Sequence, residues 1–269
     1  MPYFPPQYHF RGDQMSFSRR MLLRQATAAA AIVTSQAAEA DSAQTAPVIR
    51  AVAFDGFVIF DPRPITAMSE TLFPGRGLDL VAAWKTRQFE YTWLRTLMGS
   101  YVDFWQVTDE ALTFATEQIA LEMTPAKRMR LMDEFINLKA WDDVLPTLTT
   151  LQKMGIRLAF LNNFSKSMLE ANVQSAGLQG FFEDHLSTDL VRAYKPDPRA
   201  YRMGLDHFKL PLEQIAFAAF GGWDAAGAKR FGYPTFWCNR LKLPVEELGV
   251  VPDSIGSSTV ELAAFVQTL

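Results

Sequence analysis

Short, predominantly apolar runs alternate with longer helical stretches from Val48 to the end of the chain. Runs of this length are typical of strands that are buried on both faces of a parallel sheet. The predicted strands are residues 48–54, 156–161, 214–220 and 234–238. Their alternation with helical stretches predicts an α/β fold, with a Rossmann-like parallel sheet core and helices on both faces.

A long helical stretch interrupts this alternation directly after the first predicted strand. Apolar residues recur at helical spacing between residues 80–98 and again between 123–138, with no strand signal among them. We therefore expect a helical cap subdomain, residues 66–141, inserted into an α/β core made of residues 48–65 and 142–269. A cap in this place would cover the edge of the sheet at which parallel strands end, exclude water and supply substrate contacts.

Residues 1–47 are predicted to be an export signal and linker. Ser18-Arg19-Arg20-Met21-Leu22 resembles a twin-arginine signal, an Ala-rich segment follows, and Ala38-Glu39-Ala40 fits the A-x-A cleavage pattern. Met15 is an alternative start to Met1, because such a signal would begin shortly before the arginines. The expected location is the periplasm or the outside of the cell; the alternative is an unstructured leader on a cytoplasmic protein. No other apolar run approaches the roughly 18 residues of a membrane span, so no stable membrane anchor is expected.

Composition argues against several classes of function. The chain has 269 residues, 49% of them hydrophobic, which suits one or two domains with a full core. Its formal net charge of −3 gives no reason to expect nucleic-acid binding. The single cysteine, Cys238, permits no internal disulfide and lies in an apolar run, so we expect it to be buried. Three histidines and one cysteine give poor support to a zinc site.

Asp55 is the strongest candidate for a catalytic residue. It follows the first predicted strand directly and is itself followed by Gly56. A carboxylate in such a place is costly unless it is paired or functional. Open α/β sheets place their chemistry at the carboxyl ends of parallel strands. An aspartate there can attack carbon or phosphorus and form a covalent intermediate.

Further polar segments near strand ends complete a recognisable order: aspartate, small polar pair, lysine, aspartate. These segments are Leu161-Asn162-Asn163-Phe164-Ser165, Tyr194-Lys195-Pro196-Asp197 and Gly221-Gly222-Trp223-Asp224. With a cap after the first strand, this order resembles the haloacid dehalogenase superfamily. Glu90-Tyr91-Thr92-Trp93-Leu94-Arg95 and Asp103-Phe104-Trp105-Gln106-Val107-Thr108 narrow the resemblance to the L-2-haloacid dehalogenases, the type II haloacid dehalogenases. The resemblance covers about residues 48 to 265.

The resemblance implies hydrolytic dehalogenation of (S)-2-haloacids to (R)-2-hydroxy acids. Asp55 would attack the carbon that bears the halogen, and water would then hydrolyse the resulting ester. The implied partners are a small halogenated carboxylic acid and water, without a cofactor or a metal. Halide leaves as an anion and needs no general acid, which fits Phe57, because phosphatases of the superfamily usually carry a second aspartate there. Such phosphatases also hold magnesium with an acidic residue at the position of Ala219, five before Asp224.

The resemblance also implies a role for each candidate residue. Lys195 would keep the Asp55 carboxylate ionised and oriented, and Asp224 would partner the lysine and help to place the hydrolytic water. The implied substrate-binding residues are Lys85 for the leaving halide, Asn162 for the substrate carboxylate, Asn163 as a halide-side donor, Tyr201 near the nucleophile, and Phe57, Phe104 and Trp223 as an apolar wall.

Each of these residues also has a purely structural interpretation. Lys195 would otherwise be a solvated surface lysine, and Asp224 the N-cap of a helix that begins at Ala225. Asn163 would be a helix cap before Ser165-Lys166-Ser167. Tyr201 and the three aromatic residues of the implied wall would be ordinary core residues.

Several donors of the family are replaced in this chain. Ile59 stands where the family has a threonine, and Ala219 and Gly221 stand where it has a serine and an asparagine that orient water. Lys85 replaces an arginine and lacks its fork of donors, and Asn162 replaces a serine. Losing one preorganised donor costs about 2.7–4 kcal/mol in an oxyanion-type site. Two alternatives therefore stay open: a weakly active or non-catalytic homologue that binds small carboxylates, and a related hydrolase such as a phosphatase.

A homodimer is a further implication of the resemblance, because the family often forms one. Apolar positions of the predicted cap, such as Tyr91, Leu94 and Met98, would suit a dimer face. Ordinary packing between cap and core is the alternative.

Overall fold

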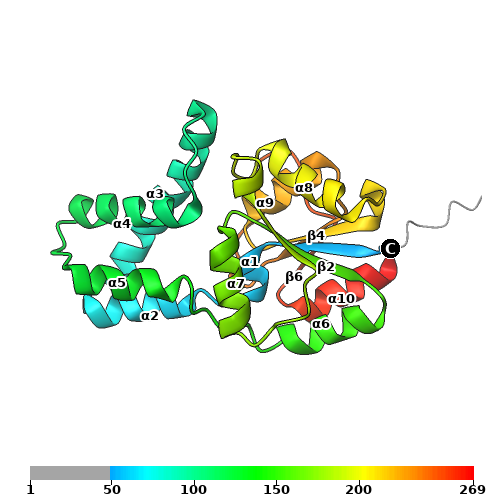
Figure 1. Cartoon of the computed structure of the whole chain (residues 1–269), viewed down its shortest axis with the longest axis horizontal. Helices are drawn as coiled ribbons and strands as arrows, with labels where there is room; N and C mark the ends of the chain where they lie inside the picture. The colour runs from blue at the N-terminus through cyan, green and yellow to red at the C-terminus, as the bar shows by residue number, and fades with distance from the viewer. Residues whose placement is uncertain (1–48) are drawn as a thin grey trace, which may run out of the picture. The chain divides into compact units, whose positions relative to one another are not determined.

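The computed structural model describes residues 49–269, so the predicted export signal, its cleavage pattern and the alternative start lie outside the described residues. A parallel sheet of six strands, in the order β3-β2-β1-β4-β5-β6, is flanked by helices (Figure 1). The strands are β1 Ala51–Phe54, β2 Arg157–Asn162, β3 Asp184–Ser187, β4 Ile215–Ala219, β5 Thr235–Cys238 and β6 Ser254–Gly256. The predicted α/β fold with a Rossmann-like parallel sheet is confirmed.

All four predicted strands form, with small differences at their ends. The largest is in β1, which begins at Ala51 rather than at residue 48. The sequence analysis missed β3 and β6, which are the two edge strands. β3 contains Asp184 and His185, and β6 has three residues with an exposed Ile255. Edge strands are only half covered, so they need not carry the apolar run by which a buried strand is recognised.

The core helices are α1 Gly56–Ile59, α6 Val144–Lys153, α7 Lys166–Ser175, α8 Pro198–Phe208, α9 Gly222–Phe231 and α10 Thr259–Thr268, with short 3-10 turns at η1 Thr188–Leu190 and η2 Leu212–Gln214. Side chains of β1 alternate between two apolar clusters. Val52 and Phe54 pack in the cluster that contains residues of α6, α7 and α10. Ala51 and Ala53 pack in the cluster that contains residues of α8 and α9. Both faces of the sheet are therefore covered, which explains why β1 reads as a buried strand.

Helices α2 Arg63–Leu72, α3 Gly77–Met98, α4 Phe104–Gln118 and α5 Pro125–Glu134 lie between α1 and β2 (Figure 1). We call residues 63–134 the helical insertion. The helical insertion starts three residues before the predicted cap, residues 66–141, and ends seven residues before the end of that range. The end of that predicted range pairs instead with the end of α1 and the segment after it, since Trp141 N donates to Ile59 O at 3.1 Å and Asp61 N donates to Lys139 O at 2.8 Å.

Three further predictions concern the burial of Cys238, a membrane span and a homodimer. Cys238 is fully buried in β5, as predicted, and burial raises the pKa of its thiol to about 12. Within residues 49–269, no helix has the length and apolarity that a membrane span requires. Leu94 and Met98 are exposed, so packing against the core does not account for them. The homodimer stays a prediction.

Candidate active site

Asp55 is held by contacts to both of its carboxylate oxygens. It follows β1 directly, and its backbone N donates to Ala218 O of β4 at 2.9 Å. Oδ2 accepts from Phe57 N at 3.1 Å, so the side chain is the N-cap of α1. Oδ1 accepts from Lys195 Nζ at 2.9 Å. The side chain is 14% exposed, and these contacts fix the plane of its carboxylate.

Lys195 lies between two carboxylates and is not a surface residue. Its side chain is 1% exposed, and Nζ donates to Asp55 Oδ1 at 2.9 Å and to Asp224 Oδ2 at 2.6 Å. The interpretation as a solvated lysine is therefore wrong. Burial disfavours its charge, but the attraction of Asp224 and Asp55 outweighs burial and holds the pKa of Lys195 above its ordinary value.

Asp224 is fully buried inside the first turn of α9. The N-cap of that helix is Gly221, so the interpretation of Asp224 as the cap is wrong. Tyr201 OH donates to Asp224 Oδ1 at 2.8 Å, which makes Tyr201 a core residue whose hydroxyl contacts the second aspartate rather than Asp55. Burial raises the pKa of Asp224 to about 6, and the charge of Asp55 acts in the same direction while Lys195 opposes both.

The two asparagines support this cluster through their amide oxygens. Asn162 Nδ2 lies 3.5 Å from Asp55 Oδ1, while its Oδ1 accepts from Phe164 N at 2.9 Å. Asn163 Oδ1 accepts from Lys195 N at 3.0 Å and so ties the end of β2 to the segment that carries the lysine. The interpretation of Asn163 as a helix cap is wrong, because Ser165 caps α7. Gly56 packs so closely on Asn162 that any side chain at that position would displace the amide.

A cavity of about 690 Å³ opens between the helical insertion and this end of the sheet. We call it the larger cavity. Every predicted site residue except Lys195 and Tyr201 lines it. Phe57 meets Phe164 edge to face at 5.1 Å between ring centroids, and Trp223 meets Phe89 of α3 at 5.3 Å. The larger cavity thus has a carboxylate at one end and aromatic walls contributed by both the core and the insertion.

Lys85 of α3 lines the larger cavity. It is exposed, and it forms no hydrogen bond or ion pair with any residue in the described part of the chain. Neighbouring atoms nevertheless displace enough water to lower the pKa of Lys85. The lysine is therefore a cation that is available to an anionic ligand.

The replaced family donors do not all face the larger cavity. Ile59 and Ala219 are fully buried and do not line it, whereas Gly221 does. A side chain at Gly221 would press on Trp223 Nε1, 2.8 Å from the place of its Cβ. Sequence reasoning missed further lining residues. Two of them, Phe164 and Phe220, could have been found because they are aromatic residues that follow the ends of β2 and β4. The missed aromatic residues are Trp84, Phe89, Trp93, Phe135, Phe164 and Phe220.

The acidic groups of the larger cavity fit an ammonium group better than a metal ion. Asp55 and Asp224 are the carboxylates around Lys195 Nζ, and a divalent cation shared by them would compete with that ammonium. Among residues 49–269, no group of three or more acidic, histidine or cysteine side chains is arranged to hold a metal.

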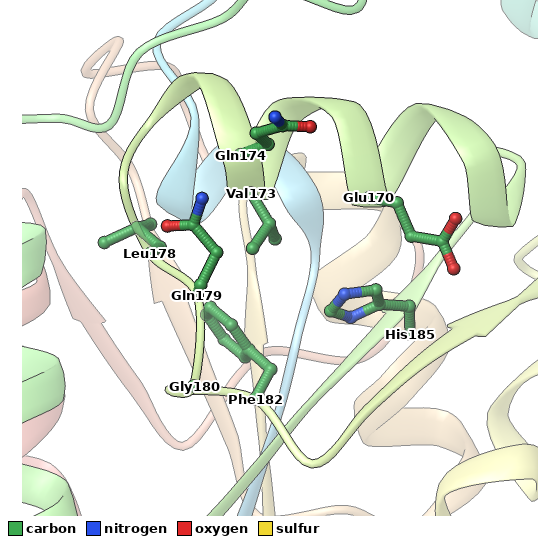
Figure 2. A pocket seen from close by; sticks show the side chains of 8 residues that line it. All are labelled: Glu170, Val173, Gln174, Leu178, Gln179, Gly180, Phe182 and His185. Atoms are coloured by element: carbon green, nitrogen blue, oxygen red, sulfur yellow. The ribbon is translucent and has the colours of Figure 1, made fainter.

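A smaller cavity of about 490 Å³ lies between α7 and β3 (Figure 2). It shares no lining residue with the larger one. Nδ1 of His185 is buried there without a hydrogen-bond partner in the described chain. The lining residues are Glu170, Val173, Gln174, Leu178, Gln179, Gly180, Phe182 and His185. The larger cavity, which holds Asp55, is therefore the candidate active site.

A parallel sheet with helices inserted after its first strand, and an Asp-Lys-Asp cluster at the strand ends, defines a hydrolase of the haloacid dehalogenase-like class. A family model described as a haloacid dehalogenase-like hydrolase matches residues 22–232. The chain belongs to this family and, within it, to the L-2-haloacid dehalogenases, which confirms the resemblance.

Three of the similar proteins are named as haloacetate or L-2-haloacid dehalogenases. Haloacetate dehalogenase H-2 of Moraxella sp. (strain B) is 39% identical over 206 residues, which are 76% of this chain and 92% of that protein. A crystal structure of an L-2-haloacid dehalogenase has a TM-score of 0.80 at 42% identity, over 81% of this chain and 99% of that one. The L-2-haloacid dehalogenase from Xanthobacter autotrophicus with chloropropionic acid covalently bound has a TM-score of 0.76 at 28% identity, over 82% and 99% of the two chains.

Proposed function

We propose that this enzyme hydrolyses (S)-2-haloacids to (R)-2-hydroxy acids through an ester on Asp55. The observation that carries the proposal is the Asp55 carboxylate itself. Both of its oxygens are held, one of them by the buried ammonium of Lys195, and it faces a cavity with aromatic walls. The names of the similar proteins support the substrate class, because they act on haloacetate or on (S)-2-haloacids.

In the first step, a carboxylate oxygen of Asp55 forms a bond to C2 of the substrate while the bond from C2 to the halogen breaks. The halide leaves with the bonding electrons, so no proton is needed. Lys195 holds and orients the Asp55 carboxylate for this attack, and the aromatic walls exclude water. Lys85 supplies positive charge in the lining of the cavity, where the halide or the substrate carboxylate can meet it. Asn162 presents its amide beside Asp55.

In the second step, water attacks the carbonyl carbon of the Asp55 ester. The bond from that carbon to the oxygen that links it to C2 breaks, and this oxygen takes one proton of the water, which completes the hydroxy acid. The other proton is released to the solvent, and Asp55 becomes a carboxylate again. Asp224 orients this water, and its place in the lining of the cavity and its contacts to Lys195 and Tyr201 support that role. The configuration of C2 inverts only once, in the first step, which gives an (R) product from an (S) substrate.

Halide release from each enantiomer of 2-chloropropionate tests the proposal, with EDTA present and Asp55→Asn as the control. We expect release from the (S) enantiomer alone, (R)-lactate as the product, and no release by the variant. A single turnover in ¹⁸O-water should label Asp55 before it labels lactate. Label that enters lactate directly would rule out the ester.

The same assay decides between the alternatives. Release from neither enantiomer, with carboxylate binding retained, would support a non-catalytic homologue. Magnesium-dependent hydrolysis of phosphate esters would support a phosphatase.

A further inference from the structure

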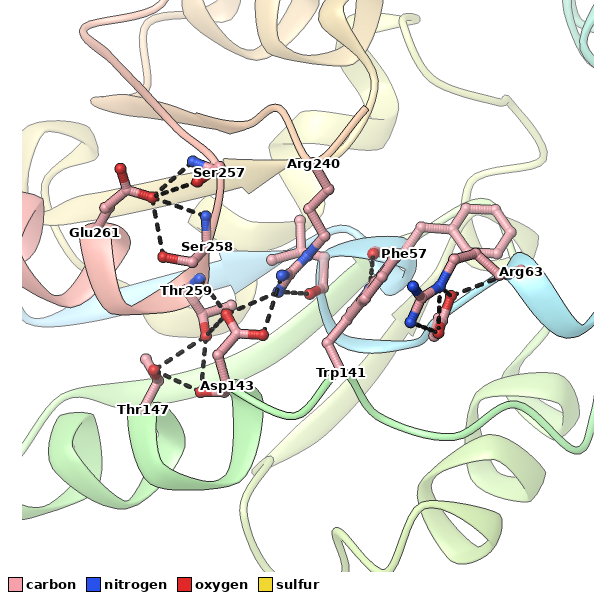
Figure 3. A network of polar contacts seen from close by, with 12 residues as sticks. Phe57, Arg63, Trp141, Asp143, Thr147, Arg240, Ser257, Ser258, Thr259 and Glu261 are labelled. Atoms are coloured by element: carbon pink, nitrogen blue, oxygen red, sulfur yellow. Dashed lines mark hydrogen bonds and ion pairs between the residues drawn. The ribbon is translucent and has the colours of Figure 1, made fainter. Parts of the chain in front are cut away.

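Asp55 and Phe57 are presented by α1, a helix of a single turn whose carbonyls cannot be satisfied within so short an element. Residues far along the chain satisfy them instead (Figure 3). Phe57 O accepts from Trp141 Nε1 at 3.0 Å, and Ile59 O accepts from Trp141 N at 3.1 Å. Val58 O accepts from Arg240 Nη2 at 3.1 Å. Three successive carbonyls of the turn are therefore held by Trp141 and Arg240.

Arg240 is fixed more firmly than a surface arginine. Its two terminal nitrogens form a fork with Asp143, each 3.0 Å from one carboxylate oxygen. Its guanidinium lies 4.6 Å from the ring centre of Trp141, and its side chain is 8% exposed. Nε is buried without a hydrogen-bond partner in residues 49–269, which is unfavourable for stability. Apolar packing would often serve a core as well as a buried ion pair, so stability alone does not account for this arginine.

Asp143 connects this arrangement to the rest of the core. Its Oδ2 accepts from Thr259 N at 2.6 Å and from Thr259 Oγ1 at 2.8 Å, at the start of α10. Thr259 Oγ1 also lies 3.0 Å from Thr147 Oγ1 of α6. Figure 3 shows the resulting network, which runs from these two helices through Arg240 to the turn of α1. The turn is thus linked through Asp143 to the start of α10 and to α6.

We propose that Arg240 and Trp141 are positioning residues for the nucleophile. By bonding to the carbonyls of α1, they fix the turn that aims the Asp55 carboxylate and the Phe57 ring into the larger cavity. Neither residue lines that cavity, so neither touches the substrate. The kinetic part of the inference rests on the proposed dehalogenation. A reacting group that moves by about 1 Å can lose roughly 100-fold in rate, so a small shift of the turn is sufficient.

Arg240→Lys and Trp141→Phe in the full chain test the proposal. Lysine keeps the charge but cannot reach Asp143 and Val58 O with a planar fork, and phenylalanine keeps a ring but has no indole N–H.

Arg157→Lys is the matched control. Arg157 also pairs with a carboxylate through two nitrogens, at 3.1 and 2.7 Å from Glu183, and donates to the carbonyl of Phe208 at 2.7 Å, but it lies at the start of β2.

We expect kcat for (S)-2-chloropropionate to fall about 10- to 100-fold in Arg240→Lys and roughly 3- to 10-fold in Trp141→Phe, with KM changed less than about threefold. Arg157→Lys should change neither constant. Amide hydrogen exchange at Phe57, Val58 and Phe60 should be faster in Arg240→Lys than in the wild type. A residue that only stabilised the fold would alter unfolding without this separation of kcat from KM.

The proposal is overturned if both variants keep kcat within about twofold of the wild type, or if Arg157→Lys loses as much activity as Arg240→Lys. If Arg240→Lys does not fold, Trp141→Phe decides alone. If the wild-type enzyme releases no halide, the proposed function is wrong, and the kinetic test of positioning does not apply. Exchange at the amides of α1 in folded Trp141→Phe would then still decide the positioning role, with unchanged exchange counting against it.

Discussion

On the sheet side of the larger cavity, Asp55, Lys195 and Asp224 each have at least two polar partners, whereas on the insertion side Lys85 has none within residues 49–269. The insertion contributes Phe89 and Trp93 to the same cavity, and both meet Trp223 through ring contacts alone. Directional contacts therefore fix the groups proposed to react, while contacts without strict direction surround the substrate. Preorganised polar groups lower the activation barrier where charge develops. Adaptable apolar walls can accommodate substrates that differ in the group attached to C2.

Lys195→Met should have the largest effect, because it breaks the fixed side of this comparison. It would leave two carboxylates buried together, so we expect loss of about 3–5 kcal/mol in the free energy of unfolding. Turnover should fall about 1,000-fold or more. Urea unfolding and halide release measure the two effects. Lys229→Met, which removes a half-exposed ion pair with Asp253, is the control and should change stability by less than about 1 kcal/mol. Activity of Lys195→Met within tenfold of the wild type would contradict the assigned role.

Asp224 should give a smaller effect that depends on pH. Because burial raises the pKa of Asp224 to about 6, its charge is present above that pH and is lost as the pH falls through it. We expect kcat/KM to decline with an acid limb near pH 6. Asp224→Asn should lower kcat roughly 100-fold at pH 8 and abolish the limb. The pH profile of (S)-2-chloropropionate hydrolysis measures both, and an unchanged limb in Asp224→Asn would assign the limb to another group.

Lys85 should give the smallest effect, on the adaptable side of the cavity. Lys85→Met should raise KM about tenfold and change kcat by less than about threefold through loss of contact with the substrate carboxylate, which is made equally before and during reaction. A larger fall in kcat would assign the lysine to the leaving halide. Lys85→Arg should preserve or raise activity on 2-chloro acids, since arginine keeps the charge and adds donors. Steady-state kinetics of both variants, beside Lys153→Met at an exposed position of α6, provide the test. A collapse of kcat in Lys85→Arg would show that the cavity is built around lysine.

The polar cluster could be predicted from the sequence because its members follow buried strands, and parallel strands bring their carboxyl ends to one edge of the sheet. The sequence also identified Ile59 as a replaced donor, but the structure buries it away from the larger cavity. The roles of Trp141 and Arg240 were not predictable in the same way. Their partners are backbone carbonyls of α1, and every residue type carries a carbonyl, so no pattern of side chains marks the contact.

The repulsion between Asp55 and Asp224 has a consequence for the order of events. The negative charge of Asp55 is one of the influences that raise the pKa of Asp224. An ester on Asp55 carries no charge, so this influence would vanish as soon as the proposed intermediate forms. Asp224 would then ionise at lower pH in the intermediate than in the resting enzyme. Alkylation of the first aspartate would thereby extend to lower pH the range in which the second is charged, at the moment when water has to be oriented.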